Sequence, residues 1–288
     1  MDGLASKLPE VIRIEPAGSC NLKCVHCPTG QGIVGEVGVM RWGTFEEAVR
    51  KIAPYAPYNA IVLYHGGEPL LNGKFIEMVK TVRPLCKKIK TVTNGTLITR
   101  QKAKEIVESG LDEITVSIDG SSAEENDKIR VGSRFSQLAE AVKLLSEENN
   151  NNRLTIIVSN SDASDNARLF MKREFSNMPS RVILRQNHFI VWPAQIGSAK
   201  KHIVMNNHCD KVYETMTIRW NGDIVPCCYD LASQGKMGSI LENSPEEIWN
   251  NDKYVSFRKA IYDRNPPDMC QSCGVLNAPP YAYKEETI

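Results

Sequence analysis

The chain has 288 residues, of which 42% are hydrophobic, and its 35 basic residues nearly balance 34 acidic ones. This length and apolar content suffice for one large α/β domain, alone or with a smaller appendage. The near-neutral charge argues against a strongly electrostatic partner such as duplex DNA or an anionic membrane, so we expect neither nucleic acid nor membrane as a partner.

Six short runs rich in Val, Ile and Thr read as buried parallel strands. They are residues 11–16, 60–66, 89–95, 113–120, 154–160 and 181–186. Helical patterns separate them, at residues 44–55, 75–85, 99–110, 135–148 and 166–177. We expect a capping box at Thr44 and Glu47 and a C-cap at Gly110. The alternation predicts a parallel sheet with right-handed crossovers, and by itself it does not distinguish an open sheet from a barrel.

After Gln186 the alternation stops, and Pro, Gly and Asn are scattered among aromatic residues up to residue 207. Beyond this stretch, TMTIRW, an Asn221-Gly222 turn and DIVPCC predict a β-hairpin. Ser244 is expected to open a helix that continues to about Tyr262, and CQSC is expected to close the ordered part. We therefore divide the chain into residues 1–186, a linker and pocket loop at 187–208, and a small domain at 209–288.

The start of the chain, MDGLASKLPEV, lacks a basic stretch followed by an apolar one, and no run of about eighteen apolar residues occurs. We therefore expect a cytoplasmic protein. In that reducing compartment, the nine cysteines are expected to hold metal or to react rather than to form a disulfide framework.

Three cysteines, Cys20, Cys24 and Cys27, directly follow the first predicted strand in the spacing C-x3-C-x2-C. Three thiolates on one tight loop can bind three irons of a four-iron cube and leave the fourth iron without a protein ligand. A zinc ion would require a fourth ligand, for which His26 is a conceivable candidate.

This spacing at the end of the first strand resembles the signature of the radical S-adenosylmethionine (SAM) superfamily. The resemblance implies a partial, six-stranded (β/α)6 barrel of the TIM-like type. It also implies that SAM binds the open iron of a 4Fe-4S cluster through its amino and carboxylate groups. Reductive cleavage of SAM would then give methionine and a 5′-deoxyadenosyl radical.

Further stretches resemble SAM-binding motifs of the same superfamily. Gly66, Gly67, Glu68 and Pro69 form a GGEP sequence after the second strand, and the resemblance implies contact with the methionine ammonium group. Asn94, at the end of the third strand, joins this expected SAM site. Ser117 would bond the ribose, and Arg130 the SAM carboxylate. An ordinary turn at GGEP and a solvated Arg130 are the structural alternatives, and we expect Glu68, Ser117 and Arg130 to bind SAM rather than to stabilise the fold.

Five cysteines follow residue 208, and their pattern resembles the shortened auxiliary-cluster domain, called twitch, of the SPASM/twitch radical SAM subfamily. The resemblance implies a second 4Fe-4S cluster held by Cys209, Cys227, Cys270 and Cys273, with Cys228 as a spare. A structural zinc site with four cysteine ligands remains the alternative. Cys86 is expected to lie in a helix as a small buried hydrophobic residue.

These features predict a radical SAM oxidoreductase that abstracts hydrogen from a small polar substrate such as a sugar or aminocyclitol. Subfamily members with one auxiliary cluster include aminocyclitol and polyol dehydrogenases, so we expect a two-electron alcohol oxidation. Arg185 and His188, just past the sixth strand, are the candidate catalytic residues. An external one-electron donor such as flavodoxin or ferredoxin is the expected partner.

Two alternatives remain open. Within the superfamily, the chain could epimerise or cross-link a ribosomally made peptide, although only nineteen residues precede Cys20 and leave no room for a peptide-binding module. In a different class, it could be a zinc-stabilised binding protein in which the SAM motifs are coincidental.

Overall fold

The structure is a computed structural model that describes residues 7–187, 207–271, 273, 276 and 284–287. In the first part of the chain, six strands alternate with helices. The strands are β1 (Val11–Ile14), β2 (Tyr58–Val62), β3 (Cys86–Thr93), β4 (Glu113–Ile118), β5 (Thr155–Asn160) and β6 (Val182–Gln186). The helices are α1 (Trp42–Ile52), α2 (Phe75–Val82), α3 (Arg100–Glu108), α4 (Ala123–Ile129), α5 (Phe135–Glu148) and α6 (Asp165–Phe175).

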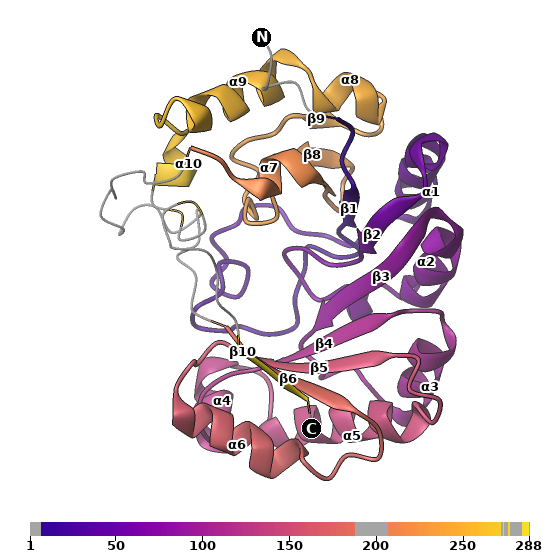
Figure 1. The fold of residues 1–288 in the computed structure, drawn as a ribbon, viewed down its shortest axis with the longest axis vertical. Helices are drawn as coiled ribbons and strands as arrows, with labels where there is room; N and C mark the ends of the chain where they lie inside the picture. Colours follow the sequence, from indigo (N-terminus) through magenta and orange to yellow (C-terminus); the bar gives the residue numbers. More distant parts are fainter. Residues whose placement is uncertain (1–6, 188–206, 272, 274–275, 277–283, 288) are drawn as a thin grey trace.

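The six strands are parallel neighbours in the order β6-β5-β4-β3-β2-β1. The sheet does not close, since β1 continues to β7 on its other side and β6 to β10. Helices α1, α2 and α3 line one side of β2 to β4, and α4 to α6 lie below (Figure 1). The predicted partial barrel is therefore confirmed, and the open form is the one adopted.

Side-chain alternation gives each strand two faces. In β4, the side chains of Ile114, Val116 and Ile118 are buried in the core beneath the helices. Thr115 and Ser117 alternate with them and point to the other side, which we call the concave face. Each fully buried aliphatic side chain contributes about 1.5–3 kcal/mol to folding, so the sheet cannot slip by one residue without losing this core.

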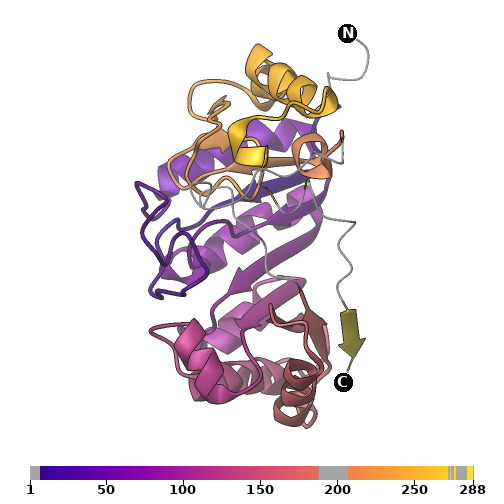
Figure 2. The same cartoon turned by 90° about the vertical axis from the view of Figure 1, so that its left-hand side faces the viewer.

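The C-terminal part extends the same sheet. It contains α7 (Asp210–Glu214), β7 (Thr215–Ile218), β8 (Asp223–Val225), β9 (Gly238–Ser239), α8 (Pro245–Trp249), α9 (Asp252–Tyr262), α10 (Asp268–Gln271) and β10 (Lys284–Thr287). Strands β7 and β8 form the predicted antiparallel hairpin, and β7 runs parallel to β1. Strand β10 pairs with β6 at one edge of the sheet, and the other elements lie together at the β1 edge in two perpendicular views (Figures 1 and 2).

Two predictions about the last part of the chain need correction. The capping box at Ser244 and Glu247 forms, but the helix it opens ends at Trp249. A second helix then begins because the Asn251 side chain accepts a hydrogen bond from the Tyr254 N–H at 2.9 Å. The chain also continues after CQSC, since β10 pairs antiparallel with β6.

Two local predictions in the barrel are wrong. Helix α1 begins at Trp42, two residues before Thr44, so the capping box expected at Thr44 and Glu47 does not form. Trp42 packs on Phe45 with ring centroids 5.2 Å apart. Cys86 is buried as expected, but it opens β3 instead of lying in a helix. Pro84 lies in the short turn Arg83–Leu85 that ends α2, and proline cannot continue an α-helix.

A search of the described residues for a helix long and apolar enough to cross a membrane found none.

Candidate active site

The loops at the carboxyl ends of β1 to β4 meet over the concave face. Cys20, Cys24 and Cys27 form what we call the first cysteine group. Their loop is hydrogen-bonded to the GGEP turn and to the segment that follows α4. Glu68 N donates to Ser19 O at 2.8 Å, and Lys23 N donates to Val131 O at 2.8 Å. Parallel sheets place ligand contacts at this end of their strands, so the sequence motifs converge where a site is expected.

The thiols of the first cysteine group are close enough to influence one another. Cys24 is buried, and Cys20 and Cys27 are half-buried. Burial raises the pKa of the Cys24 thiol to about 11, against the nearby positive charge of Arg130. The Cys20 sulfur accepts hydrogen bonds from Leu22 N at 3.5 Å and Asn94 Nδ2 at 3.8 Å. Such donors stabilise sulfur ligands of iron, so the environment fits a metal-bound thiolate.

The two glycines of the GGEP sequence are required by close packing. A Cβ added to Gly67 would lie 2.2 Å from Ser19 O, and one on Gly66 would lie 2.9 Å from Glu15 Oε1. Gly67 therefore lets the GGEP turn lie directly on the segment that leads into Cys20. Thr29 also connects the cysteine loop to the GGEP turn, because its hydroxyl donates to Gly66 O at 2.6 Å.

Glu68 is bound within the fold. It is 2% exposed, and its carboxylate accepts hydrogen bonds from Thr93 Oγ1 at 2.7 Å, Asn94 N at 2.7 Å and Leu70 N at 3.1 Å. Burial raises the pKa of this carboxyl group despite these donors. The side chain thus joins the GGEP turn to the end of β3.

Arg130 is also buried, at 8% exposure, so the alternative of a solvated arginine is wrong. Its NH1 group donates to Asp119 Oδ2 at 2.8 Å, and Asp119 also accepts from the Ser161 hydroxyl. His26 Nε2 lies 3.9 Å from the same carboxylate, and burial lowers the pKa of His26. This ion pair joins α4 to the end of β4 next to the first cysteine group.

Ser117 lies in a row of polar residues on the concave face. It is the register partner of Ser159 in β5, which in turn is the partner of Arg185 in β6. Ser117 and Arg185 are half-buried, and Asn187 Nδ2 donates to the Ser159 hydroxyl at 2.5 Å. The structure therefore aligns the expected ribose contact with one expected catalytic residue, while the other, His188, lies outside the described residues.

Glu15, which directly follows β1, was not among the expected site residues. It is fully buried and accepts from Gly66 N at 2.8 Å, His65 Nδ1 at 3.2 Å, Trp220 N at 3.1 Å and Arg219 Nε at 3.4 Å. Burial alone raises its pKa, but these partners outweigh burial and lower it to about 2. A carboxylate directly after the first buried strand is the sequence signal that could have identified it.

The second cysteine group comprises Cys209, Cys227, Cys270 and Cys273. Burial raises the pKa of Cys209 to about 11 and raises those of Cys227 and Cys270 further, and each of these three thiols also interacts with a neighbouring cysteine. None of the nine cysteines, all of which lie in the described chain, forms a disulfide. Buried thiols at this density fit a site in which metal supplies the stabilising positive charge.

Within the described residues, no three His, Cys, Asp or Glu side chains converge closely enough to hold a single metal ion. The cysteine spacing and the buried environments of the thiols are therefore the features that favour iron binding.

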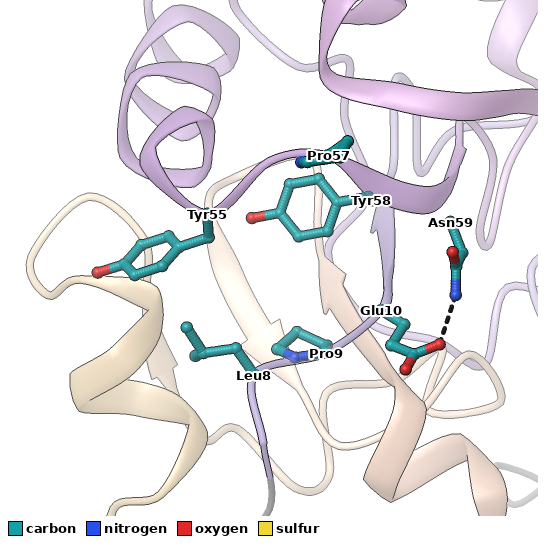
Figure 3. Close-up of a pocket in the computed structure, with 7 residues that line it drawn as sticks. All are labelled: Leu8, Pro9, Glu10, Tyr55, Pro57, Tyr58 and Asn59. Atoms are coloured by element: carbon teal, nitrogen blue, oxygen red, sulfur yellow. Dashed lines mark hydrogen bonds between the residues drawn. The ribbon is translucent and has the colours of Figure 1, made fainter.

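A separate hollow of about 310 Å³ lies at the amino ends of β1 and β2, away from these loops. It is lined by Leu8, Pro9, Glu10, Tyr55, Pro57, Tyr58 and Asn59, and an Asn59–Glu10 hydrogen bond borders it (Figure 3). None of the expected site residues contributes to it.

Residues 14–162 match the radical SAM superfamily, and residues 209–274 match the SPASM iron-sulfur cluster-binding domain. The chain belongs to the radical SAM superfamily. The cofactors of this class are SAM and iron–sulfur clusters, so the expected cofactor types and the enzyme class, a radical SAM oxidoreductase, are confirmed. The alternative in which the SAM motifs are coincidental is excluded by the match.

One relative similar over the full length is an S-adenosyl-L-methionine-dependent 2-deoxy-scyllo-inosamine dehydrogenase from Niallia circulans. It is 25% identical over an alignment of 276 residues that covers 93% of this chain and 93% of its own. An AdoMet-dependent heme synthase from Oleidesulfovibrio alaskensis is 30% identical, but only over 48% of this chain and 35% of its own length.

Solved structures share the fold. BtrN in complex with AdoMet and 2-DOIA has a TM-score of 0.63 at 19% identity and covers 93% of this chain and 94% of its own. Native anSMEcpe with bound AdoMet has a TM-score of 0.67 at 18% identity, covering 88% and 84% respectively. At these identities, the likeness establishes the fold.

Proposed function

We propose that this enzyme reductively cleaves SAM and oxidises a small polar substrate, a sugar or aminocyclitol-like alcohol, by two electrons. The observation that carries the proposal is the full-length similarity to an aminocyclitol dehydrogenase, at 93% coverage of both chains. The cysteine count agrees, because four of the five cysteines after residue 208 suffice to bind one auxiliary cluster.

The first cysteine group is proposed to hold a 4Fe-4S cluster with one iron open to SAM. When bound, this cluster supplies the electron that cleaves SAM to methionine and a 5′-deoxyadenosyl radical. The chain's own part is to hold the loop in place, through Ser19 O and the Leu22 N–H, and to exclude water from it.

The SAM site is proposed to be lined by Gly66, Gly67, Pro69, Asn94 and Ser117. Glu68 and Arg130 belong to the same site, and their charged groups are already bonded to Asn94 N and to Asp119. We therefore assign both the role of positioning the loops that receive SAM, whatever further contact each makes.

The second cysteine group is proposed to hold an auxiliary 4Fe-4S cluster, with Cys228 outside the ligand set. When bound, this cluster supplies an acceptor for the second electron of the oxidation. An external donor such as flavodoxin or ferredoxin is proposed to deliver the first electron. We propose domain limits of 1–186 and 209–288, joined by the pocket loop 187–208.

The carbinol carbon gives a hydrogen atom to the 5′-deoxyadenosyl radical, its hydroxyl loses a proton, and one electron leaves, so that a C=O bond forms. Arg185 and His188 are the proposed residues near the carbinol. An arginine is too basic to accept this proton in its ordinary state, so Arg185 is assigned to hydrogen-bond the substrate hydroxyl.

A panel of aminocyclitols and sugars, incubated with the reduced, iron-loaded enzyme, tests the proposal. A substrate should raise 5′-deoxyadenosine formation and yield a product lighter by two hydrogen atoms. The variant in which all three cysteines of the first group are replaced by alanine should form neither. If only a peptide stimulates SAM cleavage, the peptide-modifying alternative is correct.

A further inference from the structure

The tip of the β7–β8 hairpin lies against the segment that leads into Cys20. Trp220 N and Arg219 Nε both donate to Glu15 Oε2, at 3.1 and 3.4 Å. Glu15 N in turn donates to Ile218 O at 2.9 Å. Arg219 is anchored on its other side because its NH1 group donates to the Ser233 hydroxyl at 2.5 Å. The hairpin tip is thus fixed to the end of β1.

The indole ring of Trp220 packs on two glycines of the loop between β1 and α1. A Cβ added to Gly18 would lie 2.6 Å from Trp220 Cδ1, and one on Gly38 would lie 2.6 Å from Cζ3. The two glycines are themselves paired, since Gly18 N donates to Gly38 O at 2.8 Å. The ring therefore contacts backbone on both sides of this pairing, which any larger residue would prevent.

The segment beneath the ring is held from another side by the SAM motif. Ser19 O accepts from Glu68 N at 2.8 Å, and Gly67 packs directly on Ala17 O and Ser19 O. Residues 17–19 therefore lie between the GGEP turn and Trp220. Beyond Trp220, the same hairpin continues through β8 to Cys227 of the second cysteine group.

We propose that Trp220 is a positioning residue for SAM binding. By clamping residues 17–19 against the GGEP turn, it fixes the first cysteine loop in the geometry that receives SAM, and it ties that loop to the hairpin that carries Cys227. The proposal depends on membership of the radical SAM superfamily and is independent of the substrate and the net reaction.

The test uses anaerobically iron-loaded Trp220→Ala and, as a matched control, Trp42→Ala, which removes a half-buried indole that packs on Phe45 within α1. Trp220→Ala should keep the iron of the second cysteine group yet bind SAM about tenfold more weakly in calorimetry. The change that SAM causes in the electron paramagnetic resonance spectrum of the reduced first cluster should shrink in parallel. Trp42→Ala should leave both readouts as in the wild type.

A double-mutant cycle on the iron-free protein supplies a readout that needs no cofactor. Gly38→Ala should lower the melting temperature in the wild type, because its methyl group meets the indole, and should have little effect in the Trp220→Ala background. If Trp220→Ala does not fold, Trp220→Phe replaces it, with a smaller loss of SAM affinity expected. Unchanged SAM affinity and spectrum, or equal effects of Gly38→Ala in both backgrounds, would overturn the proposal.

Discussion

Replacing Glu15 with glutamine removes a buried charge while keeping the size of the side chain. The carboxylate accepts four hydrogen bonds, from two backbone N–H groups and from His65 and Arg219. A glutamine amide offers only one oxygen, so its NH2 group must face donors on one side. Arg219, which is only 5% exposed, also loses the negative charge with which its guanidinium pairs.

The size of the effect follows from the pKa of Glu15. Folding lowers this pKa from the ordinary 4.5 to about 2, which corresponds to about 3 kcal/mol of stability at neutral pH. Because the folded-state pKa is the lower one, this contribution is complete above about pH 4.5 and is lost as the pH falls toward 2. We therefore expect Glu15→Gln to reduce the free energy of unfolding by about 3 kcal/mol at pH 7.

Urea unfolding of the iron-free protein measures this loss at several pH values. The difference between wild type and Glu15→Gln should be largest at pH 7 and should narrow as the pH falls below about 4.5. Glu47→Gln is the matched control, since Glu47 pairs with Arg50 at the surface and should lose much less stability. Equal losses in the two variants, or a difference that does not change with pH, would refute the reasoning.

Three further outcomes are expected. Loaded wild type should contain about eight irons per chain, and replacing the first cysteine group with alanine should halve that number; loss of all iron, or stoichiometric zinc, would contradict the ligand assignment. Glu68→Ala should lower the free energy of unfolding by about 2 kcal/mol, because the Thr93 hydroxyl and the Asn94 N–H lose their buried acceptor, and it should also weaken SAM binding; a loss of SAM affinity at unchanged stability would instead place Glu68 in direct contact with SAM alone. Arg130→Met should lower the free energy of unfolding by about 3–5 kcal/mol, since it leaves the Asp119 carboxylate buried without its positively charged partner. Urea unfolding indistinguishable from wild type would show that the ion pair does not form.

The sequence was sufficient to predict what depends on local pattern. The apolar period of β1 to β6 located the strands, and the cysteine spacing located the loop after β1. The Asn221-Gly222 turn likewise located the β7–β8 hairpin. Each of these signals is contained within a few neighbouring residues.

What the sequence did not predict depends on contacts between distant segments. Glu15 meets Gly66 and Arg219, which lie 51 and 204 residues further along, so its four partners are assembled only by the fold. For the same reason the bonds of the Glu68 carboxylate to Asn94 N and of the Arg130 guanidinium to Asp119 were not predicted. Strand β10 was missed because its pairing with β6 depends on the edge that the open sheet leaves available.

The most direct test of the proposed reaction follows the hydrogen atom. A substrate from the aminocyclitol panel, carrying deuterium at the carbinol carbon, should transfer that deuterium to 5′-deoxyadenosine. One 5′-deoxyadenosine and one methionine should form for each substrate oxidised by two electrons. A product that instead gains solvent deuterium at a tetrahedral carbon without a change in oxidation state, and that no longer forms in Cys228→Ala, would contradict the dehydrogenase assignment and establish epimerisation.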